Sequence, residues 1–391
     1  MKKLFRGLTF DTLLLTFASF FSDVSTEMLY PVLPVFLTDV LKAPASVIGI
    51  IEGLSQGIQY VIQGFSGFLA DKFEKRKPIA LFGYALTALS KPLMGTASAW
   101  PRVLTGRFGD RLGAGIRSAP RDALIAGSAE ANSRGKAFGL EGIGDNLGAF
   151  VGPLIAILLL FYLKVNIRSI FFLAFIPGSL AFLLVLFVKE RKVQQEKKKL
   201  VFNFSLFPKS YWKYIFVSAV FGLGNSSNAF LILRAKSIGI PLITTIVIYA
   251  FFNLIAALSS FPAGSLSDTL GRKNILGLSF LIFALCYLGF ATGTNKGELG
   301  FLFILYGVYS GIFRAVGKSF ASDFVTGELR ATALGIYSTI IGVTTLIASI
   351  VAGQLWTNVS QSAAFLYGTF FAIAGTLLLF VMIPNRQKIS V

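Results

Sequence analysis

The chain has 391 residues, of which 54% are hydrophobic and only 14% are charged. This composition excludes an ordinary soluble domain, in which about a quarter of the residues are charged, and it indicates a membrane protein. The formal net charge is +18, but the basic residues are scattered over separate loops, so nucleic-acid binding is not expected. Because there is no histidine and a single cysteine, Cys286, neither a Cys/His metal site nor an intramolecular disulfide is possible.

Apolar runs of the length that crosses a bilayer, about 20 residues as a helix, recur along the whole chain. They are continuously apolar, whereas strands of a membrane β-barrel would be shorter and would alternate in polarity. The sequence therefore predicts an all-α membrane protein with twelve transmembrane helices. The predicted helices cover residues 10–37, 45–70, 78–97, 100–126, 135–163, 167–188, 211–235, 241–266, 274–293, 298–321, 330–356 and 362–384.

The first run follows a basic start, as in a secretory signal, but it is long, contains acidic residues and lacks an evident cleavage site. We expect it to be retained as the first helix. Lysine and arginine are concentrated in alternate loops, for example at 72–77, 189–199 and 272–273, while the opposite loops contain few. The positive-inside rule then places both termini in the cytoplasm. These features predict a multi-pass, monomeric protein of the cytoplasmic (inner) membrane, with the lipid bilayer as its surroundings.

The two halves of the sequence resemble each other. "GFLADKFEKRK" at 67–77 matches "GSLSDTLGRKN" at 264–274, and "RGKAFG" from Arg134 matches "RATALG" from Arg330 at nearly the same offset. A long polar stretch lies between the halves. We therefore predict two pseudo-symmetric six-helix bundles, residues 1–188 and 211–391, joined by a cytoplasmic linker over 189–210. Parallel repeats around a central site are the architecture of one large class of transporters.

The loop after the second run is similar to a signature of the major facilitator superfamily, and the resemblance to this family covers the full chain. The signature reads Gly-x-Leu-Ala-Asp-Arg-x-Gly-Arg-Arg, and Gly67, Asp71 and Arg76 match it, whereas Glu74 replaces a glycine. The resemblance implies a secondary active transporter that moves a small organic solute by alternating access. It also implies that the protein is not an enzyme and needs no cofactor.

Two further motifs carry this resemblance. The fifth run resembles the antiporter motif of the family through Gly139, Gly148, Gly152 and Pro153. The fourth run, "RFGDRLGAGIRSAPRDALIA", resembles a branch of poorly characterised bacterial permeases with "DRxGKGIRxxPRDALIA", and Ala114 replaces the lysine. The motif in the fifth run favours export, because its resemblance is to antiporters.

Asp23 and Glu27 lie in an otherwise apolar stretch, "FFSDVSTEMLYPVLPVFL". On a helix they share one face with other polar residues, so they are expected to face protein or water. Ionisable residues in membrane helices cost about 2.5–3.5 kcal/mol each on insertion scales and tend to mark ion pathways. Because burial favours the uncharged acid, the pair could take up and release protons. The alternative is a static ion pair with an arginine of the fourth run.

Other charged residues inside the predicted helices extend this pattern. Arg107 and Arg111 should pair with acids of neighbouring helices, and either of them could match the arginine that the family uses in proton coupling. Purely structural pairing is the alternative. The predicted proton-coupling residues are Asp23, Glu27, Glu52, Arg107, Asp110, Arg111, Glu141 and Asp145.

Polar side chains on the cavity-lining helices are candidates for binding a solute. The predicted substrate-binding residues are Tyr30, Gln56, Gln59, Asn225, Asn228, Tyr249, Asn253, Tyr306, Ser310 and Arg314. The predicted gating residues would let helices approach or would close the inner face by capping helix dipoles. They are Gly67, Asp71, Arg76, Arg121, Gly148, Gly152, Pro153, Asp268 and Arg272.

Three functions compete at this stage. The first is a proton-driven exporter, in which solute and proton compete for the acids. The alternative is a proton-coupled importer of an organic anion or siderophore, which Arg107, Arg111, Arg314 and Lys318 would suit. The third is a membrane receptor or scaffold. No nucleotide-binding loop, histidine-activated nucleophile or metal-ligand set is present, so we do not expect an enzyme.

Overall fold

The computed structural model describes residues 9–73, 76–129, 133–190, 204–325 and 329–384, without the side chains of 67–73, 134, 204 and 331. These parts of the chain form helices joined by short turns and contain no strand. The prediction of an all-α protein is therefore confirmed.

A helix or a pair of consecutive helices occupies each predicted apolar run. The N-terminal helices are α1 (Phe10–Glu27), α2 (Leu33–Val35), the π-helical turn η1 (Phe36–Val40), α3 (Ala45–Phe73), α4 (Arg76–Gly95), α5 (Trp100–Ser128), α6 (Arg134–Ile157), the π-helical turn η3 (Leu158–Tyr162), α7 (Ile167–Leu173) and α8 (Phe175–Phe187). The C-terminal helices are α9 (Lys209–Gly224), α10 (Ala229–Ser237), α11 (Leu242–Leu270), α12 (Arg272–Thr292), α13 (Lys296–Asp323), α14 (Arg330–Asn358) and α15 (Gln361–Met382). A short 3-10 turn, η4 (Phe204–Leu206), precedes α9.

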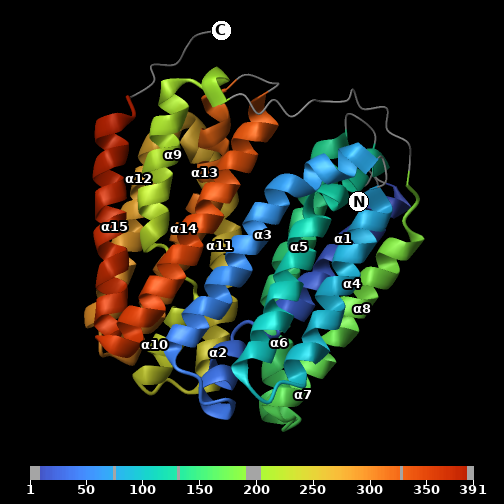
Figure 1. The fold of residues 1–391 in the computed structure, drawn as a ribbon, viewed down its shortest axis with the longest axis vertical. Helices are drawn as coiled ribbons and strands as arrows, with labels where there is room; N and C mark the ends of the chain where they lie inside the picture. Colours follow the sequence, from blue (N-terminus) through green and yellow to red (C-terminus); the bar gives the residue numbers. More distant parts are fainter. Residues whose placement is uncertain (1–8, 74–75, 130–132, 191–203, 326–328, 385–391) are drawn as a thin grey trace.

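The N-terminal and C-terminal helices lie side by side as two groups (Figure 1). Helix α3 packs along α14, and α6 packs along α11, so these two helix pairs join the groups. We call the end where α8 ends and α9 begins the linker end, and the opposite end, with α2, α7 and α10, the far end (Figure 1). Helix α1 begins and α15 ends near the linker end.

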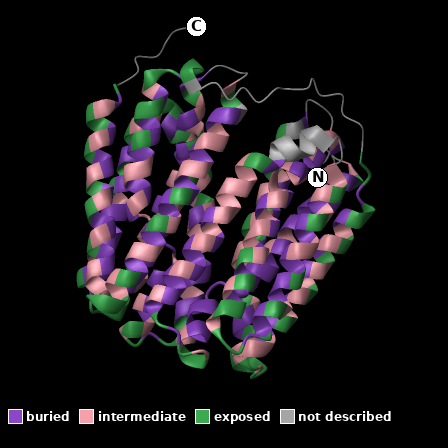
Figure 2. Cartoon of the chain, viewed as in Figure 1, coloured by how far each residue is buried: buried purple, intermediate pink, exposed green. Residues whose placement is uncertain are grey.

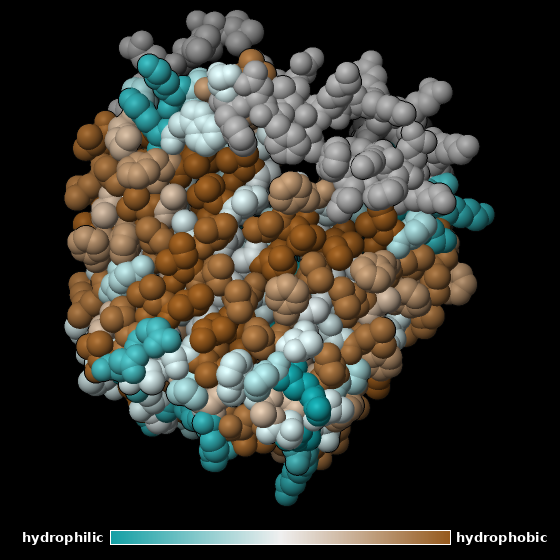
Figure 3. Space-filling view, in the orientation of Figure 1, coloured by the Kyte–Doolittle hydropathy of each residue, from teal (hydrophilic) through white to brown (hydrophobic). Residues whose placement is uncertain are grey.

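The outer surface is that of a membrane protein. Among the described residues, nine helical stretches are long and apolar enough to cross a bilayer. Large apolar side chains point outward, including Phe261 at 85% exposure and Val381 at 82%. Figure 3 shows a broad hydrophobic belt over the middle of the molecule, with hydrophilic residues at both ends. Helices α1, α4 and α5 are not among these nine stretches, so twelve crossings remain a prediction.

The buried residues follow the sides of the helices that face other helices (Figure 2). In the C-terminal helices they include many aromatic residues: the rings of Phe221 and Phe280 stack with centroids 3.8 Å apart, and those of Phe283 and Tyr287 are 4.0 Å apart. In the N-terminal helices, charged side chains are buried as well. The two groups therefore differ in chemistry although they are alike in form.

Two predicted continuous helices are interrupted. The run 10–37 leaves the α-helical form after Glu27, before Pro31 and Pro34, because proline cannot donate to the helical ladder. The run 211–235 is broken between Gly224 and Ala229. The break contains Asn and Ser side chains, which compete with the helix by bonding to nearby backbone groups. Both interruptions lie beside the cavity described below.

Candidate functional site

A cavity of about 400 Å³ lies between the two groups of helices. Its walls come from α1, α3, α5, α6, α11, α13, α14 and the break between α9 and α10. Most of the predicted binding residues line it, together with Asp23 and Glu27 of α1 and Arg111 of α5: Asp23, Glu27, Tyr30, Gln56, Arg111, Asn225, Asn228, Tyr249, Asn253, Tyr306, Ser310 and Arg314. The predicted residue Gln59 does not line it but accepts a hydrogen bond from Arg111 Nη1 at 3.2 Å.

The two acids of α1 that line the cavity, Asp23 and Glu27, have different surroundings. Tyr249 Oη donates a hydrogen bond to Glu27 Oε2 at 3.0 Å, across the two groups of helices. Asp23, one turn nearer the linker end, makes no hydrogen bond or ion pair with the described residues, although Arg117 and Arg121 act on it electrostatically. Asp23 is thus the acid of this cavity whose carboxylate is left to solvent or a solute.

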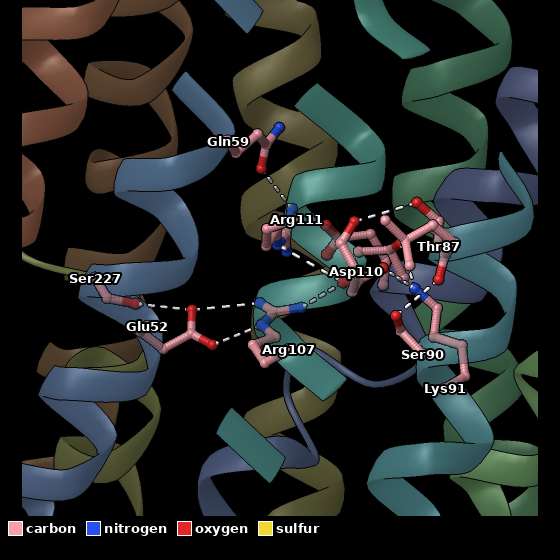
Figure 4. Close-up of polar contacts among 12 residues, drawn as sticks. Glu52, Gln59, Thr87, Ser90, Lys91, Arg107, Asp110, Arg111 and Ser227 are labelled. Carbon is pink, nitrogen blue, oxygen red and sulfur yellow. Dashed lines mark hydrogen bonds and ion pairs between the residues drawn. The ribbon is translucent and has the colours of Figure 1, made fainter. Parts of the chain in front are cut away.

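A buried charge network lies beside the cavity (Figure 4). Arg107 Nε donates to Glu52 Oε1 at 2.8 Å and its Nη2 donates to Glu52 Oε2 at 3.3 Å. Arg107 Nη1 also donates to Asp110 Oδ2 at 3.2 Å, and the ammonium group of Lys91 donates to Asp110 Oδ1. Arg111 Nε lies 3.8 Å from Asp110 Oδ2. Glu52, Lys91, Arg107 and Asp110 are each no more than 1% exposed, so the ion pairs are shielded from solvent.

Ser227, in the break between α9 and α10, links this network to the C-terminal helices. Its Oγ donates to Glu52 Oε2 at 3.3 Å and lies 3.1 Å from Tyr30 Oη. The backbone N–H of Ala229 donates to Ser227 Oγ at 3.3 Å. One hydroxyl group therefore contacts an acid of α3 and a tyrosine that follows α1.

Arg121 organises a second charged cluster nearer the linker end. Its Nη1 lies 2.9 Å from Glu141 Oε1 and 3.7 Å from Asp145 Oδ1, and its Nη2 lies 3.0 Å from Asp122 Oδ1. Ser19 Oγ on α1 donates to Glu141 Oε1 at 3.1 Å. The expected pairing of the α5 arginines with acids on both sides is thus present, with Glu52 on one side and Glu141 and Asp145 on the other.

The glycines of the predicted antiporter motif pack α6 against the acids of α1. An added Cβ at Gly148 would lie 2.5 Å from the Phe20 carbonyl oxygen and 2.9 Å from Asp23 Cβ, and one at Gly152 would lie 3.0 Å from Glu27 Cβ. Small residues permit this close approach. Pro153 lies inside α6, which continues into the π-helical turn η3.

The remaining predicted gating residues lie at the linker end. Arg272 Nη2 lies 3.3 Å from Asp268 Oδ1, and its Nη1 lies 2.7 Å from Asp323 Oδ1. Asp268 thus pairs with an arginine of the next helix. The backbone N–H of Arg76 donates to Glu190 Oε1 at 2.6 Å. The predicted roles of Gly67 and Asp71 fall on side chains outside those that the structure describes.

The far end is closed by contacts between the two groups. Lys236 on α10 pairs with Asp39 of η1, and the backbone N–H of Ser46 donates to Thr357 Oγ1 at 2.9 Å. Near the start of α3, Gly49 packs against the backbone of α14 at Gly353. Together with Tyr30 and Ser227, these contacts hold the groups together on the far side of the cavity.

Sequence reasoning assigned no role to Lys91 or Ser227, and it named Lys318 only as a cation that would suit an organic anion. Lys91 was a charge inside a predicted helix without an assigned partner, and the structure pairs it with Asp110. Ser227 lies in the polar run "GNSSN", which was the available signal. Lys318 lines the cavity one turn beyond Arg314.

An all-helical membrane protein with two groups of helices around a polar central cavity belongs to the class of small-molecule transporters. The comparison with known families agrees: residues 15–234 and 214–390 match the model of the Major Facilitator Superfamily. The chain belongs to this superfamily. It is therefore a membrane transporter and not an enzyme.

Individual relatives support this assignment. The chain is 36% identical over 385 residues to an uncharacterized MFS-type transporter of Methanocaldococcus jannaschii, with 96% of each chain covered. It is 26% identical over 350 residues to a probable 4-methylmuconolactone transporter of Cupriavidus pinatubonensis, covering 83% of this chain and 79% of the relative. The solved structure of a mutant of the nucleoside transporter NupG has the same fold, with a TM-score of 0.80, 17% identity and coverage of 96% of this chain and all of the other.

Proposed function

We propose that this protein is a proton-coupled secondary transporter that moves a small organic solute by alternating access. The proposal includes twelve crossings of the cytoplasmic (inner) membrane, both termini in the cytoplasm, and a monomer whose halves, 1–188 and 211–391, rock about the cavity. In this arrangement the linker end faces the cytoplasm, and Arg121, Asp268 and Arg272 act in gating there. The probable 4-methylmuconolactone transporter among the relatives is consistent with a small organic solute.

The observation that carries the proposal is the position of Asp23 and Glu27. Both carboxylates line the same cavity as the neutral and cationic side chains that could hold a solute. Protonation of either acid removes a negative charge from this cavity, so the free energies of binding a proton and a charged solute are coupled. A transporter that binds both in one cavity can use a proton gradient to move the solute.

Export is the direction that the antiporter motif favours. Gly148 and Gly152 place the backbone of α6 directly against Asp23 and Glu27. A cationic solute, or one that donates hydrogen bonds to these carboxylates, competes with protons for them. Protons that enter from the other side would then displace the solute, which is antiport.

Import is the direction that two cations in the cavity favour. Arg314 and Lys318 line it, and an organic anion bound to them is repelled by ionised Asp23 and Glu27. Protonation of the acids removes this repulsion, so proton and anion bind together, which is symport. The charge of the solute thus decides between the two directions.

Transport by the purified protein in liposomes, with an imposed pH gradient, tests the proposal. Radiolabelled benzoate, ethidium and uridine serve as anionic, cationic and neutral probes. We expect at least one probe to move with the gradient, and we expect Asp23→Asn or Glu27→Gln to abolish gradient-driven movement while probe exchange continues. Lys136→Gln is the matched control, because Lys136 is exposed on α6 outside the cavity. If coupling is unchanged in both acid variants, these acids do not couple transport to protons.

A further inference from the structure

Helix α13 presents a polar stripe to the cavity. Tyr306, Ser310, Arg314 and Lys318 are spaced by four residues, which places them on one face of a helix, and all four line the cavity. Arg314 Nη2 donates to Ser310 Oγ at 3.3 Å. The stripe therefore ends in two cations one turn apart, at the side of the cavity toward the linker end.

Neither cation has a carboxylate partner. Among the described residues no acid lies within ion-pair distance of Arg314 or Lys318, and both side chains are exposed. This differs from the N-terminal helices, where Arg107 and Arg121 each contact two or more acids. Like charges four residues apart on a helix repel each other. A bound anion would relieve this repulsion, and arginine forms its strongest hydrogen bonds to carboxylate or phosphate oxygens.

The acids of the cavity belong to the other group of helices. Glu27 already accepts the hydrogen bond from Tyr249, and Asp23 lies on α1, without contact to Arg314. Glu27 acts electrostatically on Arg314, and Asp122 acts on Lys318, but no ion pair between these described residues forms in this arrangement of the helices.

Aromatic rings form the adjacent wall. Tyr30 and Tyr249 stack with centroids 5.3 Å apart and an interplanar angle of 13°, Tyr249 contacts Phe252 at 5.5 Å, and Phe252 stacks on Tyr306 at 5.6 Å. All four line the cavity, and the half-buried Phe313 joins them.

The tyrosine hydroxyls of this wall are occupied by protein partners. Tyr30 contacts Ser227, Tyr249 donates to Glu27, and Tyr306 Oη donates to Asn228 Oδ1 at 2.9 Å. These tyrosines therefore offer few free donors, and the four rings of the wall line the cavity although each residue is only 2–5% exposed. Ring surface is selective for flat, apolar groups, and aromatic groups gain about 0.5–1.5 kcal/mol beyond simple burial.

We propose that the solute is a small aromatic carboxylate, with its carboxylate on Arg314 and Lys318 and its ring against the Tyr249, Phe252 and Tyr306 wall. This assignment rests on the proposed transport function and selects its symport direction. The cavity volume of about 400 Å³ is within the range of small-molecule sites, about 300–1,000 Å³.

Equilibrium binding to the purified full-length protein, without any proton gradient, tests the assignment. Benzoate is the probe, benzamide is its uncharged counterpart, cyclohexanecarboxylate lacks the aromatic ring, and inorganic phosphate is an anion without a ring. We expect calorimetry to show benzoate binding more tightly than all three. Arg314→Gln should weaken benzoate binding about tenfold to a hundredfold, as expected for loss of a hydrogen bond to a charged group, and Arg314→Lys should retain part of the affinity.

The remaining outcomes decide against the assignment. They are absence of benzoate binding to the wild-type protein, equal binding of benzamide, equal binding of cyclohexanecarboxylate or of phosphate, and unchanged benzoate affinity in Arg314→Gln. Lys136→Gln, outside the cavity, should bind benzoate as the wild type does. Failure of proton coupling in the liposome assay overturns the proposed function but leaves this binding result intact, so the two failures are distinguishable.

Discussion

The contact between α6 and α1 leads to a sharp prediction, because two glycines of the same motif differ in their surroundings. An added Cβ at Gly148 would lie 2.5 Å from the Phe20 carbonyl oxygen, whereas one at Gly139 would meet nothing within 4 Å. Alanine gains up to about 1 kcal/mol of helix propensity over glycine at either position. Only at Gly148 is this offset by overpacking, which costs about 1–3 kcal/mol. The backbone oxygen of Phe20 cannot move aside as a flexible side chain could.

Gly148→Ala should therefore be less stable than Gly139→Ala by about 1–3 kcal/mol. The assay is thermal unfolding of both variants in one detergent, followed by circular dichroism. At roughly 2–4 °C per kcal/mol for a chain of moderate size, the apparent Tm of Gly148→Ala should be several degrees lower. Equal Tm values for the two variants would refute the close packing of α6 on α1, and with it the argument that these glycines position Asp23 and Glu27.

Three further predictions concern ion pairs and lone charges. Glu52→Gln breaks the buried pair with Arg107 and should lower the unfolding free energy by about 3–5 kcal/mol. In a double-mutant cycle, the variant that also has Arg107→Gln should lose less than the sum of the two single losses. Strict additivity of the two losses would show that the pair is not coupled. Asp23→Asn removes a carboxylate with no direct partner, so its Tm should match or exceed that of the wild type while gradient-driven transport is lost; a marked fall in Tm would instead identify Asp23 as a structural residue. Lys236→Ala removes a solvent-exposed pair with Asp39 and should change the unfolding free energy by less than about 1 kcal/mol. A larger loss in denaturant unfolding at physiological salt would contradict that estimate.

Much of the fold follows from the positions of apolar runs alone, because a helix that crosses a bilayer needs about 20 apolar residues. The helices lie where the runs predict them, and the nine most apolar meet the requirements for spanning. The interruptions were harder to predict. The break between Gly224 and Ala229 depends on whether its polar groups find partners in other elements. The Ser227 hydroxyl contacts Glu52 of α3 and Tyr30, and the Ser227 backbone N–H donates to Ser349 Oγ of α14.

The sequence predicted which residues of the candidate site share a helix face, but not which side chains form ion pairs with one another. Helical spacing placed Asp23 and Glu27 on one side of α1, and both line the cavity. Periodicity on single helices gives no information on the rotation of one helix relative to another, so it could not predict which arginine of α5 pairs with Glu52. The structure gives that place to Arg107. The pairing of Lys91 with Asp110 likewise depends on how α4 faces α5. The proton-coupling role of all these residues remains a prediction.

The hydroxyl of Ser227 has a consequence for how the two halves communicate. A serine has one hydrogen to donate, and here it goes to Glu52 while the oxygen meets Tyr30. In the proposed alternating-access cycle, separation of the halves at this point would exchange this protein donor of Glu52 for water. The charge environment of the α3–α5 interface would thereby depend on the direction of access.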